Sequence, residues 1–123
     1  MDNDRVKFVV DKANGAVIAE INNTMFDVLY LVNRKFVQNA TSGIEINVGD
    51  LPRNPKFEMN TKYKAVARLR PGDEWDEERG KEIARNKLTE VYHNGVNKRL
   101  ANYSTYLRKI ADNIDAYLAK QHN

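Results

Sequence analysis

The sequence predicts one α+β domain that spans residues 1–123. Apolar and polar residues alternate in several stretches before residue 70, which indicates strands, whereas the rest of the chain has helical spacing. A chain of 123 residues has room for one modest core. We therefore expect an N-terminal β-hairpin, a helix, further antiparallel strands and two long C-terminal helices packed on the sheet.

The hairpin is expected first. Val6–Asp11 and Ala16–Ile21 are rich in β-branched residues and are separated by a loop that ends in Asn14-Gly15. Asn-Gly is a strong hairpin signal because both residues tolerate the positive φ angles of a type I′ turn. The preceding pair Lys12-Ala13 could widen this loop.

A helix is the preferred prediction for Met25–Asn39. Asn22–Thr24 offers an N-cap, and apolar residues follow at helical spacing. The run MFDVLYLV within it is also rich in residues that favour strands, so a buried strand is the alternative. Further on, Ile44–Val48 alternates as a short strand, and Gly49–Pro55 has the composition of a loop.

The strictest alternation in the chain runs from Phe57 to Arg70. One face is apolar, and the other is largely basic, carrying Lys62, Lys64, Arg68 and Arg70. Because this run is longer than a usual strand, a turn near Asn60-Thr61 could divide it into a hairpin.

Two helices are expected after the turn at Pro71-Gly72. Asp73 is the expected N-cap of the first, and the acidic residues that follow it suit the positive end of a helix dipole. His93-Asn94-Gly95 is a typical helix end. The second helix has a heptad seam formed by Val96, Leu100, Tyr103, Leu107, Ile110, Ile114 and Tyr117.

The heptad seam has two interpretations. It could pack on the domain's own sheet, or it could pair with a second copy of the chain. Intramolecular packing is favoured, because so short a chain needs this face for its core and because Tyr103 and Tyr117 are bulky for a two-stranded coiled coil. We expect a monomer or a homodimer through this last helix.

Composition narrows the class of protein. Hydrophobic residues make up 41% and charged residues 30%, as in globular chains. No apolar run reaches the roughly 18 residues of a membrane span, and Met1–Asp4 lacks the pattern of a signal peptide, so we expect a cytoplasmic protein without a membrane partner. The absence of cysteine excludes disulfides, thiolate metal sites and a cysteine nucleophile.

Residues 67–84, read as ARLRPGDEWDEERGKEIA, carry a resemblance. The segment resembles one found in small uncharacterised proteins of phages and prophages of Gram-positive bacteria. In those proteins a strand ends in a Pro-x-Asp turn, and an aromatic-Asp pair and a Gly and Ala one turn apart follow, here Pro71, Asp73, Trp75-Asp76, Gly80 and Ala84. They often have cysteine at the position of Leu69 and phenylalanine at that of Trp75. The resemblance implies a phage or mobile-element origin and the cytoplasm of a host cell, but no activity.

Catalytic and metal-binding patterns are weak in this sequence. The acidic run from Asp73 to Glu78 could be read as the metal site of a nuclease, but consecutive helical residues point around the helix and do not converge on one ion. His93 and His122 have no partner at metal-ligand spacing, and no phosphate-binding glycine loop is present. We therefore predict no catalytic residues, no metal and no cofactor, with a metal-dependent nuclease as the third hypothesis.

The basic strand face of Lys62, Lys64, Arg68 and Arg70 is the candidate binding site. Alternate strand residues are about 7 Å apart, near the spacing of successive phosphates, so these cations could follow a nucleic-acid strand. A solvated face of an ordinary sheet is the alternative. Residues 1–60 carry 7 basic and 8 acidic side chains and residues 61–123 carry 13 and 9, which places the positive excess in the second half.

The expected function is that of a non-enzymatic binding protein. It would contact a host protein or nucleoprotein complex, in particular a component of nucleic-acid processing or defence, as an inhibitor or accessory protein. Direct binding of nucleic acid through the basic strand face is the alternative hypothesis.

Overall fold

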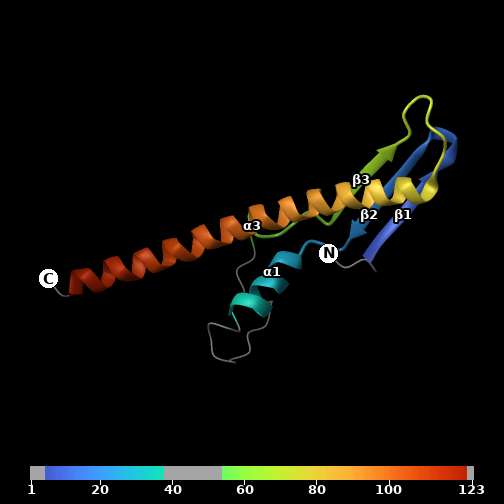
Figure 1. Ribbon diagram of the computed structural model, residues 1–123. Coiled ribbons are helices and arrows are strands. Elements are labelled where there is room, and N and C mark those ends of the chain that lie inside the picture. Colours follow the sequence, from blue (N-terminus) through green and yellow to red (C-terminus); the bar gives the residue numbers. More distant parts are fainter. Residues whose placement is uncertain (1–4, 38–53, 122–123) are drawn as a thin grey trace.

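The computed structural model describes residues 5–37 and 54–121 of the chain. This part forms an antiparallel sheet with strand order β1-β2-β3, a short helix α1 and a long helix α3 that runs past the sheet (Figure 1). The predicted α+β class is confirmed. The predicted strand Ile44–Val48 lies outside the described residues. The elements are β1 Val6–Asp11, β2 Ala16–Asn22, α1 Asp27–Leu31, β3 Lys62–Arg68 and α3 Glu77–Gln121.

The predicted hairpin is formed by β1 and β2, which pair from Val6 with Ile21 to Asp11 with Ala16. Its loop is the wider form, with a 3₁₀ turn at Lys12–Asn14. The Asp11 side chain accepts hydrogen bonds from the backbone and side chain of Asn14 (3.2 and 2.8 Å). Gly15 follows with φ 61°, so one residue, and not the pair of a type I′ turn, supplies the left-handed backbone.

Helix, and not strand, is the structure of the segment after β2. α1 ends at Leu31, and the chain continues without a break as a π-helical segment over Val32–Val37. The expected N-cap is wrong, because α1 starts only at Asp27 and the Thr24 hydroxyl donates to the carbonyl of Asn60. Thr24 is fully buried, and its hydrogen bond joins the segment before α1 to the segment before β3 instead of capping a helix.

The alternating run after residue 56 is strand in its second half alone. β3 pairs with β2 from Lys62 with Asn22 to Arg68 with Ala16. Phe57 and Met59 lie before the strand, and both are buried in the core. The backbone N–H of Met59 donates to the carbonyl of Met25 (2.9 Å), which fixes this irregular segment beside the entry to α1. Burial was thus predicted correctly for Phe57 and Met59, whereas residues 57–61 form neither part of one long strand nor the first strand of a hairpin.

A tight turn connects β3 to α3. Pro71-Gly72 lies at its centre, Gly72 has φ 89°, and the N–H of Asp73 donates to the carbonyl of Arg70 (3.0 Å). Asp73 is therefore a turn residue, and the prediction that it caps the helix is wrong. The cap is Asp76, whose carboxylate accepts from the backbone N–H of Arg79 (3.1 Å).

α3 is one continuous helix of 45 residues, so the predicted division into two helices at His93-Asn94-Gly95 is wrong. Gly95 is buried in the helix interior and faces the domain. A Cβ atom at this position would lie 3.1 Å from the Tyr63 hydroxyl and 3.3 Å from Cε of Met59. The glycine thus serves close packing rather than a left-handed helix end.

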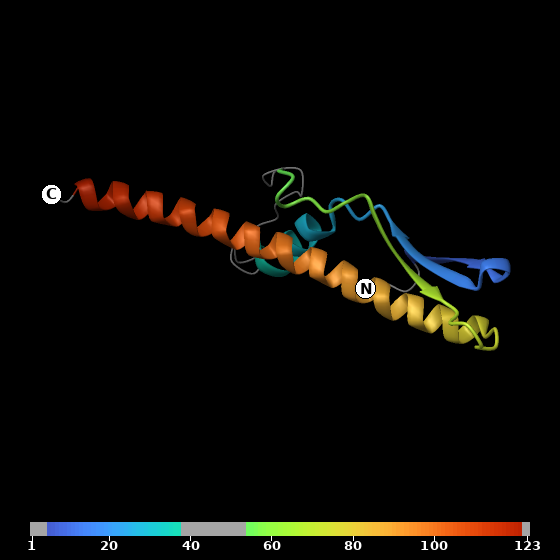
Figure 2. The ribbon, with the colours of Figure 1, turned by 90° about the horizontal axis from the view of Figure 1, so that it is seen from above.

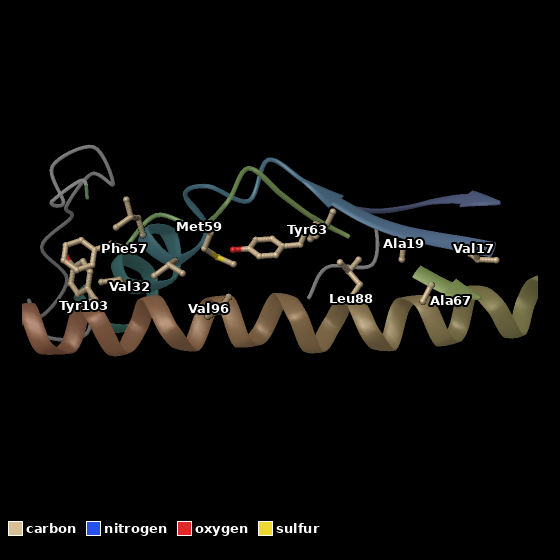
Figure 3. Close-up of a cluster of buried hydrophobic side chains, with 14 residues drawn as sticks. Val17, Ala19, Val32, Phe57, Met59, Tyr63, Ala67, Leu88, Val96 and Tyr103 are labelled. Carbon is tan, nitrogen blue, oxygen red and sulfur yellow. The ribbon is translucent and has the colours of Figure 1, made fainter. Parts of the chain in front are cut away.

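The core lies between α3 and the facing side of the sheet, and continues to α1 (Figure 3). Near the start of α3, small residues let the helix approach the strands closely, and the Cβ that Gly80 lacks would lie 2.7 Å from a methyl group of Val17. Further along, Leu88 is fully buried. The far end of the core is aromatic, where Phe57 packs on Tyr103 with ring centroids 4.9 Å apart.

The core ends at Tyr106, whereas α3 continues to Gln121 (Figure 2). The heptad seam is therefore used in two ways. Val96 and Tyr103 are buried in the domain, as expected for intramolecular packing. Beyond Tyr106 the expectation of intramolecular packing fails within the described residues, because Leu107 is 49% exposed and Tyr117 is 62% exposed.

Candidate functional site

The sheet has one covered face and one uncovered face. α3 covers the face that carries Val17, Ala19 and Ala67 (Figure 3). Within residues 5–37 and 54–121, no helix packs on the opposite side, which we call the outer face. Side chains alternate along each strand, and the register assigns to the outer face Lys7, Val9, Asp11, Ala16, Ile18, Glu20, Asn22, Lys62, Lys64, Val66 and Arg68.

The outer face has an apolar centre. Val9 pairs with Ile18, and Ile18 pairs with Val66, so the three side chains form one row across all three strands. Val9 is 54% exposed although it is a large apolar side chain. Such a row on an uncovered face is typical of a surface that another molecule covers.

Charged residues flank this apolar row. On one side, Glu20 lies between Lys7 and Lys64, its partners in the two neighbouring strands. On the other side, Arg68 follows Val66 on β3. Three of the predicted binding residues, Lys62, Lys64 and Arg68, are exposed on the outer face, and in the part of the chain that the structure describes none of them forms an ion pair.

The fourth predicted residue, Arg70, does not lie on the sheet. β3 ends at Arg68, and Arg70 begins the turn that leads to α3, where its N–H donates to the Asp73 carboxylate (3.2 Å). The basic track is also interrupted, because Val66 occupies the position between Lys64 and Arg68 on the outer face. The four cations therefore do not form one continuous row.

Sequence reasoning missed a polar junction where β1, α1 and α3 meet. The Asp27 carboxylate accepts hydrogen bonds from the Arg5 guanidinium (3.0 Å) and from the Tyr92 hydroxyl (2.7 Å). Burial, and then the hydrogen bond to Asp27, raise the pKa of Tyr92 above its ordinary value. The three residues are far apart in the sequence, so no local pattern indicates the junction.

The polar junction lines an open groove of about 720 Å³ between α1 and α3. His93 lines it too, with its ring centroid 5.6 Å from that of Tyr92. Arg5 and Tyr92 both donate to Oδ2 of Asp27, so this oxygen is engaged in holding the elements together. We therefore interpret the junction as a structural tie rather than as a site for a reaction.

The acidic residues before and within the first turn of α3 have structural roles. Asp73 belongs to the turn and Asp76 caps the helix. Glu77 and Glu78 both lie near the Lys81 ammonium, at 3.4 and 3.8 Å. Among the residues that the structure describes, no three histidine or acidic side chains are arranged to hold a metal ion.

Comparison with known proteins adds no family to this description: no protein-family model, curated protein or solved structure matches the chain. None of the helices described here combines the length and the apolar character that a membrane span requires. The interpretation of the outer face therefore rests on its own chemistry.

Proposed function

We propose that this chain is a non-enzymatic binding protein whose outer face docks on an acidic protein surface. The observation that carries the proposal is the apolar row of the exposed Val9 and the half-buried Ile18 and Val66. It is flanked by Lys62, Lys64 and Arg68, which have no ion-pair partners among the described residues. An apolar centre with a polar rim is the usual anatomy of a protein interface. A cationic rim favours a partner with an acidic one.

The same features argue against a phosphate backbone as the main partner. A nucleic-acid strand needs a continuous series of cations, whereas Val66 breaks the series on β3. Glu20, opposite Lys64, would also repel phosphate. Direct nucleic-acid binding stays the second hypothesis, supported by the three exposed cations on one face.

The resemblance of residues 67–84 to phage and prophage proteins suggests where the partner is found. We propose that the chain originates from a phage or a mobile element and acts in the cytoplasm of a Gram-positive host. Its target would be a protein of nucleic-acid processing or defence, and the chain would inhibit or assist it by covering its surface.

The experiment is affinity capture from a Gram-positive host lysate, performed with and without nuclease treatment. A protein partner should be recovered equally well from both lysates, and moderate salt should weaken its recovery. Recovery of nucleic acid alone, or of proteins that disappear after nuclease treatment, would contradict a protein target and support the second hypothesis.

Enzymatic activity needs its own assay, because the proposal excludes it. The purified chain is incubated with nucleic acids and nucleotides in the presence of Mg²⁺ or Mn²⁺. We expect no turnover. Turnover that is abolished by Asp73→Asn or Asp76→Asn would establish the nuclease hypothesis and refute a purely binding function.

A further inference from the structure

The last part of α3, residues 107–121, is a helical arm that leaves the domain (Figure 2). Every residue of this arm is exposed. Its large apolar side chains are 39 to 62% exposed, and they are Leu107, Ile110, Ile114, Tyr117 and Leu118. Such a contiguous apolar stripe indicates an interaction surface.

The exposed stripe continues the seam that packs inside the domain. Val96 and Tyr103 belong to the same heptad positions as Ile110 and Tyr117, and both are buried. The arm therefore exposes the same side of α3 that carries the sheet and α1 nearer to its start. A sustained heptad pattern is suited to pairing with another helix of the same pattern.

We propose that the arm pairs with the arm of a second copy of the chain, in antiparallel orientation. In a parallel pair the two domains, which occupy the seam side of α3 as far as Tyr106, would face each other at the same end of the arms and collide. In the antiparallel orientation the two domains lie at opposite ends of the paired arms. The proposal is independent of the binding function of the outer face.

The spacing of the seam residues defines a register for this orientation. A two-fold axis near Asp112 relates the seam residues of the two copies. The same axis places Leu107 opposite Tyr117 and Ile110 opposite Ile114.

The area available is enough for a weak dimer. If each half-exposed side chain loses about 90 Å², roughly half of what a buried aromatic residue loses, the ten in a pair remove about 900 Å² before flanking groups are counted. This value is near the lower limit for specific interfaces, so a dimer that dissociates on dilution is expected.

Sedimentation of the full chain from micromolar to millimolar concentration tests the proposal. The mass should rise from 14.2 kDa towards twice that value. Ile114→Asp should weaken the dimer about tenfold or more, because it places a carboxylate in the seam. Ala119→Asp adds the same charge on the opposite side of the arm and should have little effect.

The orientation is tested with single cysteines, since the chain has none. On oxidation, a mixture of Leu107→Cys and Tyr117→Cys chains should give a mixed disulfide, and Tyr117→Cys alone should not give a dimer. A chain that is monomeric at millimolar concentration, a dimer that Ile114→Asp leaves intact, or a disulfide formed by Tyr117→Cys alone would overturn the proposal.

Discussion

Gly80 lies where α3 passes closest to the sheet. Alanine favours a helix by about 1 kcal/mol relative to glycine, but its Cβ at this position would lie 2.7 Å from Cγ2 of Val17. We expect Gly80→Ala to lower the free energy of unfolding by about 1 to 3 kcal/mol, as overpacked cores do. Urea denaturation measures this loss.

The Val17→Ala variant provides the control for Gly80. Removing the methyl groups of Val17 makes room for the new Cβ, so in the Val17→Ala background Gly80→Ala should be neutral or stabilising. If Gly80→Ala stabilises the chain with Val17 intact, the close approach of α3 to β2 is wrong.

The hydrogen bond of Tyr92 should also contribute measurably to stability. Its hydroxyl donates to Asp27, and Tyr92→Phe should lower the free energy of unfolding by about 1 kcal/mol at neutral pH. Thermal or urea unfolding of the variant measures this, with Tyr30→Phe, at an exposed tyrosine, as the control. Equal stability of Tyr92→Phe and the unaltered chain would contradict the junction.

The raised pKa of Tyr92 also predicts a pH dependence. The folded chain keeps this proton to higher pH than the unfolded chain, whose tyrosines titrate near pH 10. The stabilisation is therefore complete below pH 10 and is lost as the pH rises further. The stability difference between the unaltered chain and Tyr92→Phe should shrink above pH 10, and a difference that grows there would contradict the assignment.

Gly95 shows what a single sequence does not reveal about residues. After His93-Asn94 it has the local pattern of a helix end, yet it lies within α3. Tyr63 and Met59 occupy the space that a side chain at this position would require. The reason lies in residues far earlier in the chain. By contrast, the turn at Pro71-Gly72 was predictable, because its geometry depends on those two residues.

At the scale of elements, α3 has two parts with different roles, and stability should reflect them. Leu88 is fully buried, and Leu88→Ala should lower the free energy of unfolding by about 2 to 5 kcal/mol. Leu107→Ala, at the start of the arm, should cost less than about 1 kcal/mol when measured on the dilute monomer. Similar losses would mean that the arm folds back on the domain.

The strands show where periodicity is sufficient. The hairpin of β1 and β2 was predicted because its turn signal and both strands are adjacent in the sequence. The outer-face positions of Lys62, Lys64 and Arg68 also followed from alternation alone. The apolar row of Val9, Ile18 and Val66 could not be predicted, because it depends on the register of β2 with β3, which are separated by a long connection.

At the scale of the whole molecule, the domain has two exposed surfaces with different chemistry. The outer face combines an apolar row with cations, whereas the arm carries a heptad seam. An antiparallel pair of arms would hold two outer faces at opposite ends of one assembly. Such a dimer would bind a partner with two copies of the target surface more tightly than a single chain does.

The most direct test of the account is the effect of the outer face on partner capture. From nuclease-treated lysate, the double variant Lys62→Glu/Arg68→Glu should recover at least tenfold less of the partner protein than the unaltered chain. The two cations that the variant lacks are the ones that meet the acidic rim of the partner in the proposed complex. Lys98→Glu/Lys109→Glu makes the same change in net charge on α3 and should recover the partner normally. Equal recovery by both double variants, or a loss confined to the α3 variant, would contradict the claim that the outer face is the binding surface.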